Sequence, residues 1–159
     1  MRGPRQLLGA ALLVASCATS PLRARDAHFT GYLPIPPGQS RLYVYRPETS
    51  IKTPRDEAPM EVDSRPLAHL GRDEYVSITL PPGTHRLGAS PPAATGYNPH
   101  PPARVFELEA DRATYCRVFP IPEGVVFLWD IRCGKDPEAH AALRECTAAP
   151  LDRTVDWQL

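Results

Sequence analysis

The sequence predicts an all-β fold: a small antiparallel β-sandwich of about seven or eight strands with one short C-terminal helix. From Arg41 onward, short segments of alternating apolar and polar residues are separated by turn residues, a pattern typical of antiparallel sheets. The 20 prolines among 159 residues belong in loops, turns and strand edges, so long helices are excluded. Short connections favour hairpins and meanders over crossovers.

The first predicted strand covers 41–47 (RLYVYRP). Residues 58–71 are predicted to form two brief strands around a turn at Asp63 and Ser64, because short polar side chains of this kind bond to nearby backbone. The two faces of the first strand carry Leu42, Val44 and Arg46 on one side and Tyr43 and Tyr45 on the other.

The next strand, 74–83, has an apolar face formed by Val76, Ile78 and Leu80 and ends at a Pro-Pro-Gly sequence. Residues 84–90 are predicted to return as its hairpin partner. Three later strands are expected at 103–109, 114–121 and 125–133, with Phe127 and Trp129 on the core face that Ile131 shares.

One helix is predicted over 136–146, with Asp136 as N-cap and Pro137 at its first position. Its apolar face, which we expect to lie on the sheet, consists of Ala139, Ala142, Leu143 and Cys146.

The N-terminal segment 1–16 has the charged and apolar regions of a secretory signal and is too short to span a bilayer. The sequence that ends it, Val14-Ala15-Ser16-Cys17, resembles the lipobox of bacterial lipoproteins. The resemblance implies cleavage before Cys17 and attachment of acyl chains such as palmitate to its thiol, which would anchor the chain stably. The alternatives are an ordinary cleavable signal with an incidental cysteine, or a buried helix.

Charge and the residue after Cys17 bear on localisation. Removal of two arginines and no acidic residue leaves 16 basic and 18 acidic residues, a formal charge of −2. The full chain has 18 of each, so no basic field favours nucleic acid. Ala18 stands where an Asp would indicate inner-membrane retention. We therefore expect a lipid anchor on the periplasmic face of the bacterial outer membrane, with the inner membrane as the alternative.

The predicted domain organisation is a signal peptide (1–16), a lipidated proline-containing tether (17–40), a β-sandwich (41–148) and a C-terminal tail (149–159). The tether can extend freely in a polyproline-like form. Alternatively its latter half, which contains Phe29, Tyr32, Leu33 and Ile35, docks on the domain.

Taken in order, RLYVYRP, MEVDSRPLAHLGRDEYVSITLPPGTHRL, VFELEADRATYCRV and DPEAHAAL resemble a family of small bacterial lipoprotein-type domains of unknown function, with a hairpin motif similar to that of PEGA-type sandwiches. The resemblance covers about residues 41–145 and implies an envelope-associated β-sandwich without assigned activity. Two features depart from it: Ser64 replaces a usual glycine, which implies a different turn geometry, and 91–102 has the character of an insertion.

Cys116, Cys133 and Cys146 remain after lipidation of Cys17, in a compartment that permits disulfides. If 114–121 and 125–133 form a hairpin about residues 122–124, Cys116 lies opposite Cys133 within bridging distance. This pairing is favoured and leaves Cys146 as a buried small apolar residue or, alternatively, a partner in an intermolecular disulfide. A Cys133–Cys146 disulfide is the other intramolecular alternative.

Catalytic motifs are missing from the sequence, and no cofactor is expected. The five histidines lack zinc-ligand spacing, and neither a nucleophile elbow nor a glycine-rich phosphate loop occurs. His85 is expected to bond a backbone carbonyl or an Asp and so fix a turn. An unrecognised metal or hydrolytic site would need strand-borne residues such as His69, His85 and Asp130 to converge.

The preferred function is a non-enzymatic binding or scaffolding module for an envelope protein or the cell wall. Candidate contact residues are Tyr97 and His100, in the proline-rich loop 90–104, and Arg46. Prolines limit the entropy lost when a loop is ordered. The alternatives are a solvated loop without a partner and an arginine that only covers a strand edge. A purely structural envelope lipoprotein is the remaining possibility.

Overall fold

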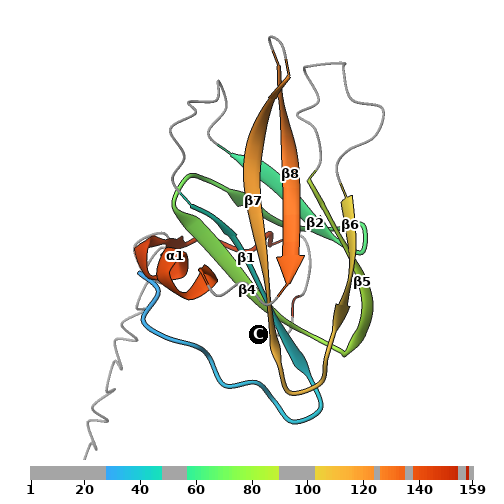
Figure 1. Cartoon of the computed structure of the whole chain (residues 1–159). Coiled ribbons are helices and arrows are strands. Elements are labelled where there is room, and N and C mark those ends of the chain that lie inside the picture. Colours follow the sequence, from blue (N-terminus) through green and yellow to red (C-terminus); the bar gives the residue numbers. More distant parts are fainter. Residues whose placement is uncertain are drawn as a thin grey trace, which may run out of the picture.

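The computed structural model describes residues 28–47, 57–89, 103–123, 126–134, 138–153 and 157 (Figure 1). The predicted fold class is confirmed: two sheets, of five and four strands, form a sandwich-like fold with one short helix near the C-terminus. Its elements are β1 (Ser40–Arg46), β2 (Ala58–Val62), β3 (Arg65–Leu70), β4 (Glu74–Leu80), β5 (Gly83–Ala89), β6 (Ala103–Leu108), β7 (Ala113–Glu123), β8 (Val126–Gly134), α1 (Ala139–Glu145) and β9 (Thr147–Ala148).

The larger sheet has the order β8-β7-β1-β4-β9 and the smaller one β3-β2-β5-β6. Most pairs are antiparallel, but β1 pairs with β7 and β4 with β9 in parallel. The expected hairpin between 74–83 and 84–90 is wrong, since β5 leaves the sheet of β4 and pairs with β2 and β6. Pro81 and Pro82 cannot donate ladder hydrogen bonds and Gly83 has a φ of 130°, so the chain turns the corner between the sheets here.

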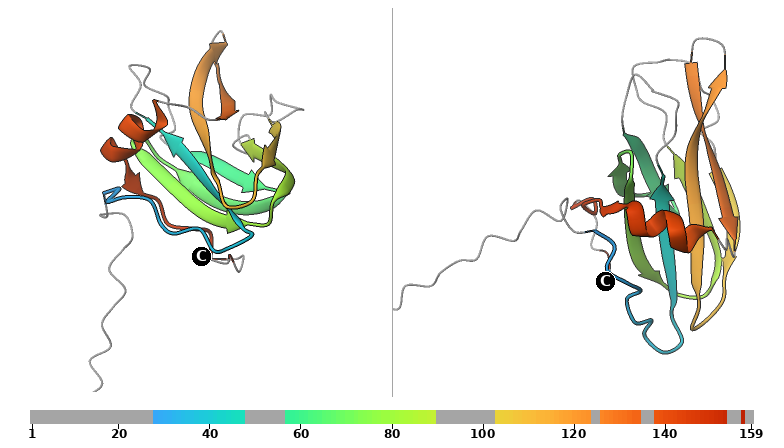
Figure 2. Two further views of the ribbon diagram at one scale, coloured as in Figure 1. Left: turned by 60° about the horizontal axis from the view of Figure 1, so that its bottom comes forward. Right: turned by 60° about the vertical axis from the view of Figure 1, so that its left-hand side comes forward.

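Strand β1 is buried along its whole length, because both of its faces are covered. Leu42 and Val44 face the core between the two sheets, whereas Tyr43 and Tyr45 belong to a second cluster under α1. The predicted alternation of this strand is therefore confirmed. Figure 2 shows α1 lying across the outer face of the larger sheet.

The turn between β2 and β3 is at Asp63 and Ser64, as predicted, with Val62 opposite Arg65. Asp63 and Ser64 have φ values of 51° and 65°, and positive φ at both central residues is what a type I′ hairpin turn requires. Asp-Gly favours this same turn. Ser64 therefore adopts the left-handed backbone that glycine favours, and the difference in turn geometry from the resembled family stays a prediction.

Strands β7 and β8 form the predicted hairpin, with Cys116 opposite Cys133 and Val118 opposite Ile131. A disulfide joins the two cysteines, so the favoured pairing is confirmed and the Cys133–Cys146 alternative is wrong. The hairpin is longer than predicted, because β7 continues through Glu123. Trp129 is in the core as expected, whereas the Phe127 side chain lies outside the described part of the chain.

The helix is shorter than predicted. It begins at Ala139 with Glu138 as N-cap, so the expectation of a helix capped at Asp136 is wrong. Glu138 makes no side-chain capping bond. The predicted apolar face does pack on the sheet through Ala139, Ala142 and Leu143. Cys146 is the C-cap and is fully buried and unpaired, as the prediction of a small apolar residue requires.

Two segments outside the predicted sandwich pack onto it. Before β1, a bridge pairs His28 with Thr147 and the N–H of Phe29 donates to the Cys146 carbonyl, so the tether docks from residue 28 onward, one of the two alternatives. After β9, the chain follows β3. The Asp152 N–H donates to the Leu67 carbonyl, and the Trp157 indole packs into the core.

Candidate binding site

Three candidate residues of the sequence, Cys17, Tyr97 and His100, lie outside the described residues. Arg46 is 1% exposed. Its guanidinium donates to the Leu70 carbonyl at 3.3 Å and its Cζ lies 4.7 Å from the centroid of the Trp129 ring. Arg46 therefore connects the two sheets inside the sandwich and is not presented to solvent.

The fold separates the three residues named for a hidden catalytic or metal site. His69 is exposed on β3, His85 is buried on β5 and Asp130 is on the outer face of β8. Among the described residues, no group of three or more His, Cys, Asp or Glu side chains is placed to hold a metal ion.

His85 bonds both an aspartate and a backbone carbonyl, the two kinds of partner that the sequence predicted, and the aspartate belongs to the turn between β2 and β3. Its Nδ1 lies 2.7 Å from Asp63 Oδ2, and its Nε2 lies 2.9 Å from the Pro81 carbonyl oxygen. The other oxygen of Asp63 accepts the Arg86 N–H. The carboxylate and the carbonyl oxygens are both acceptors, so each ring nitrogen of His85 faces an acceptor atom. This network joins three segments of the chain.

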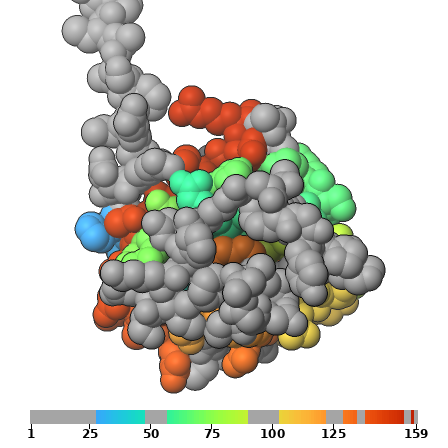
Figure 3. Space-filling view, turned by 90° about the horizontal axis from the view of Figure 1, so that it is seen from above, coloured from blue at the N-terminus to red at the C-terminus, as the bar shows by residue number. Residues whose placement is uncertain are grey.

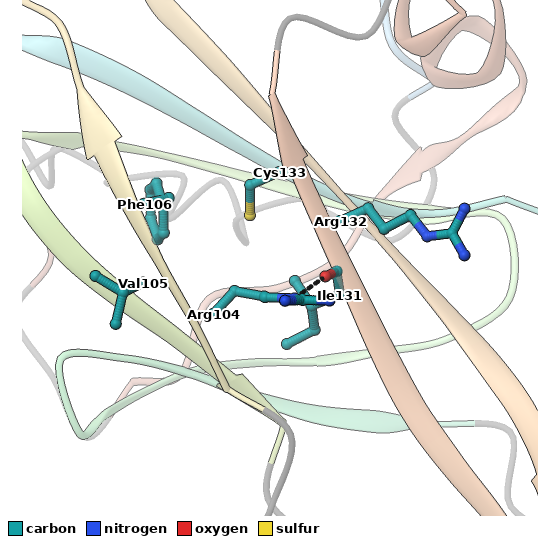
Figure 4. Close-up of a pocket in the computed structure, with 6 residues that line it drawn as sticks. All are labelled: Arg104, Val105, Phe106, Ile131, Arg132 and Cys133. Carbon is teal, nitrogen blue, oxygen red and sulfur yellow. Dashed lines mark hydrogen bonds between the residues drawn. The ribbon is translucent and has the colours of Figure 1, made fainter.

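An open depression of about 320 Å³ lies between the edge strands of the two sheets, β6 and β8. Figure 4 shows Arg104 and Phe106 of β6 pointing toward Ile131 and Cys133 of β8, with Val105 on the other side of the β6 ribbon. Viewed from the end that carries the hairpin, Figure 3 shows atoms of β6 (yellow) and of the β7–β8 hairpin (orange) on the same surface. We call the surface around this depression, which residues 104–106 of β6 and 131–133 of β8 line, the β6–β8 side.

At the free edge of β8, side chains form hydrogen bonds with the backbone carbonyl and N–H groups of Ile131. The Arg104 Nε donates to the Ile131 carbonyl at 2.9 Å, as Figure 4 shows, and Asp130 Oδ1 accepts the Ile131 N–H at 2.9 Å. Exposed strand edges are prone to pair with other chains. These contacts protect one edge and connect the two sheets through Arg104.

On the outer face of the hairpin, Arg117 of β7 lies directly opposite Arg132 of β8. We call these residues the arginine pair. Their Cζ atoms lie 6.0 Å and 4.7 Å from the centroid of the Phe119 ring. Asp130 contacts the Arg132 Nε at 3.5 Å and the Arg104 Nη2 at 3.7 Å. The alternating pattern of both strands could have placed these residues on one face, although no sequence motif marks them.

Aromatic side chains hold the docked segment before β1 against the larger sheet. Tyr32 makes edge-to-face contact with Tyr43 and Phe29, and its hydroxyl hydrogen-bonds to His140 of α1. Tyr43 and Tyr115 stack at 5.6 Å between ring centroids. Burial raises the pKa of the Tyr115 phenol to about 12. Ring centroids this close indicate a packed cluster rather than an open aromatic cage.

The described part of the chain contains no helix long and apolar enough to cross a membrane. Comparisons with protein-family models, with curated proteins and with solved structures found no match to this chain.

Proposed function

We propose that this chain is a lipid-anchored, non-enzymatic binding module of the bacterial cell envelope, and that its β6–β8 side contacts the partner. The anchor is the Cys17 thiol, which follows a lipobox-like sequence. The observation that carries the proposal is the separation of the anchored end from that side. His28 lies at the β9 edge of the larger sheet, whereas β8 forms its other edge.

The dimensions of the fold support this arrangement. The segment from Cys17 to Ala27 spans at most about 40 Å when fully extended. The docked segment from residue 28 ties the β9 edge to that short connection. Four strand spacings, about 19 Å, separate β9 from β8. The β6–β8 side is thus at the edge of the larger sheet farthest from the edge that carries the anchored segment.

The resemblance to small lipoprotein-type domains agrees with this proposal and supplies no activity. A catalytic function is less well supported, because His69, His85 and Asp130 lie on different faces of the sandwich. A purely structural envelope lipoprotein differs from a binding module in having no specific contact at the β6–β8 side.

Intact-mass analysis of the protein from membranes of its own host tests the anchor. The expected product begins at Cys17 and carries acyl chains, and Cys17→Ser should abolish acylation and release the protein from the membrane. Recovery of an unmodified product that begins at Met1 and is freely soluble overturns the proposal.

Site-specific photo-crosslinking in intact cells tests the binding side. A crosslinker at position 132 should give a reproducible adduct, whereas one at position 69, which is similarly exposed but on the smaller sheet, should not. Identical adducts at the two positions, or none at position 132, contradict a specific contact at the β6–β8 side.

A further inference from the structure

The arginine pair places like charges directly opposite each other across antiparallel strands, an arrangement that destabilises a sheet. Both guanidinium groups are nevertheless positioned by the ring of Phe119. Such cation–π contacts orient a guanidinium group, and its N–H groups can still donate hydrogen bonds in the plane of the guanidinium. The hairpin therefore carries a preoriented set of donors on its outer face.

The acidic groups near the pair do not balance its charge. Asp130 contacts Arg132 and Arg104 at 3.5 Å and 3.7 Å. Within the described ranges no ion pair joins Arg117 to another residue, and its buried Nε has no hydrogen-bond partner. The guanidinium groups of Arg104, Arg117 and Arg132 and the single carboxylate of Asp130 together carry a net charge of +2.

We propose that the arginine pair binds the phosphoryl group of a phosphomonoester. A phosphomonoester carries about −1.5 to −2 charges at pH 7 and three acceptor oxygens, which match the local charge and allow both guanidinium groups to donate. A single carboxylate carries one charge, and one guanidinium can satisfy it through two parallel hydrogen bonds. Access to the site is open, since the Arg132 side chain is 73% exposed.

This inference rests on the proposed function in one respect: it specifies a ligand chemistry for the outer face of the β7–β8 hairpin, which borders the β6–β8 side at Arg132. The phosphoryl group could belong to a soluble phosphorylated compound or to a lipid headgroup.

The first test is a titration of the full chain with inorganic phosphate, followed by NMR of the arginine Nε–Hε signals. The signals of Arg117 and Arg132 should shift. Arg117→Gln and Arg132→Gln should each weaken phosphate binding about tenfold, the loss expected for one charge-assisted hydrogen bond. Arg86→Gln is the matched control, because Arg86 is an exposed strand arginine of the smaller sheet that pairs with Glu61. It should bind phosphate like the wild type.

Absence of any shift, or equal weakening in all three variants, overturns the inference. Without phosphate, Arg117→Gln should unfold at the same temperature as the wild type or higher, because the like-charge contact is gone. If this variant fails to fold, the exposed Arg132→Gln decides: undiminished phosphate binding in that variant also overturns the inference.

Vesicles distinguish the two sources of the phosphoryl group. Vesicles of phosphatidylcholine containing phosphatidic acid, a phosphomonoester lipid, should retain the Cys17→Ser chain more than pure phosphatidylcholine does if the source is a headgroup. Equal retention, with phosphate binding intact, assigns the site to a soluble phosphomonoester. Phosphate binding does not depend on acylation. The phosphate titration therefore tests the arginine pair alone, whereas intact-mass analysis tests the lipid anchor alone, so failure of one proposal can be told from failure of the other.

Discussion

Asp63 and His85, 22 residues apart in the chain, are joined by a contact of 2.7 Å between Oδ2 and Nδ1. His85 is 9% exposed, and its second nitrogen is bound to the Pro81 carbonyl. The pair therefore connects the turn between β2 and β3 to the corner where the chain passes from one sheet to the other. It is a structural element of the sandwich, and its disruption should be visible in stability.

Replacement of this histidine should destabilise the fold. We expect His85→Ala to lower the free energy of unfolding by about 1–3 kcal/mol, because it removes a buried imidazole and the two hydrogen bonds that this ring makes. Urea unfolding measures the change. A double-mutant cycle with Asp63→Ala should give a coupling free energy of about 1 kcal/mol. His69→Ala, at an exposed position, serves as the control and should change stability by less than about 0.5 kcal/mol.

Glycine at position 64 should stabilise the protein. Ser64 has a φ of 65°, and a left-handed backbone costs a non-glycine residue about 1–2 kcal/mol. Part of this gain is lost because glycine also increases the entropy of the unfolded chain. We expect Ser64→Gly to raise the free energy of unfolding by about 0.5 kcal/mol, whereas Ser64→Ala, which retains a Cβ, should not raise it. A gain in the alanine variant would point to a cause other than the backbone.

Loss of the disulfide should weaken the attachment of β8. The disulfide joins Cys116 and Cys133 across a separation of 17 residues, for which loop closure predicts a stabilisation of about 3 kcal/mol. The Cys116→Ala/Cys133→Ala variant should therefore unfold at a lower urea concentration. Hydrogen exchange should rise most in β8, because it is an edge strand. Exchange that rises equally in β4, which β1 and β9 flank, would contradict this local effect.

The Cys146 thiol should be unreactive in the folded protein. It is fully buried, and desolvation together with the nearby Asp73 carboxylate raises its pKa from 9.0 to about 12. Only the thiolate reacts appreciably with thiol reagents. Iodoacetamide at neutral pH should leave the peptide containing Cys146 unmodified, as measured by mass spectrometry, and should label it after denaturation. Rapid labelling of this peptide in the native chain would show that the thiol is accessible.

Stability should decrease between pH 10 and pH 12. Desolvation by burial, the largest cause, raises the pKa of Tyr115 from 10.0 to about 12. In this pH range the unfolded chain releases a proton that the folded chain retains, so the free energy of unfolding falls as pH rises. Tyr115→Phe should make that decrease less steep. The free energy of unfolding measured by urea at several pH values tests this, and an unchanged slope in the variant would rule out a contribution from Tyr115.

The sequence by itself determined the local features of this protein. Side-chain alternation assigned the faces of β1, because successive residues of a strand point to opposite sides. The hairpin register followed from the short turn and placed Cys116 opposite Cys133. The fixed backbone of proline and the turn preference of Asp63 marked where strands end.

Only the tertiary structure decided how these elements combine. The passage of β5 into the second sheet and the parallel pairing of β1 with β7 join segments far apart in the chain, and periodicity does not encode which strands become neighbours. Asp130 meets Arg104 because the edge strands β6 and β8 face each other. The chain after β9 packs on β3 because the apolar Trp157 is buried in the core. Such contacts depend on the summed packing of the whole sandwich, which no single stretch of sequence specifies.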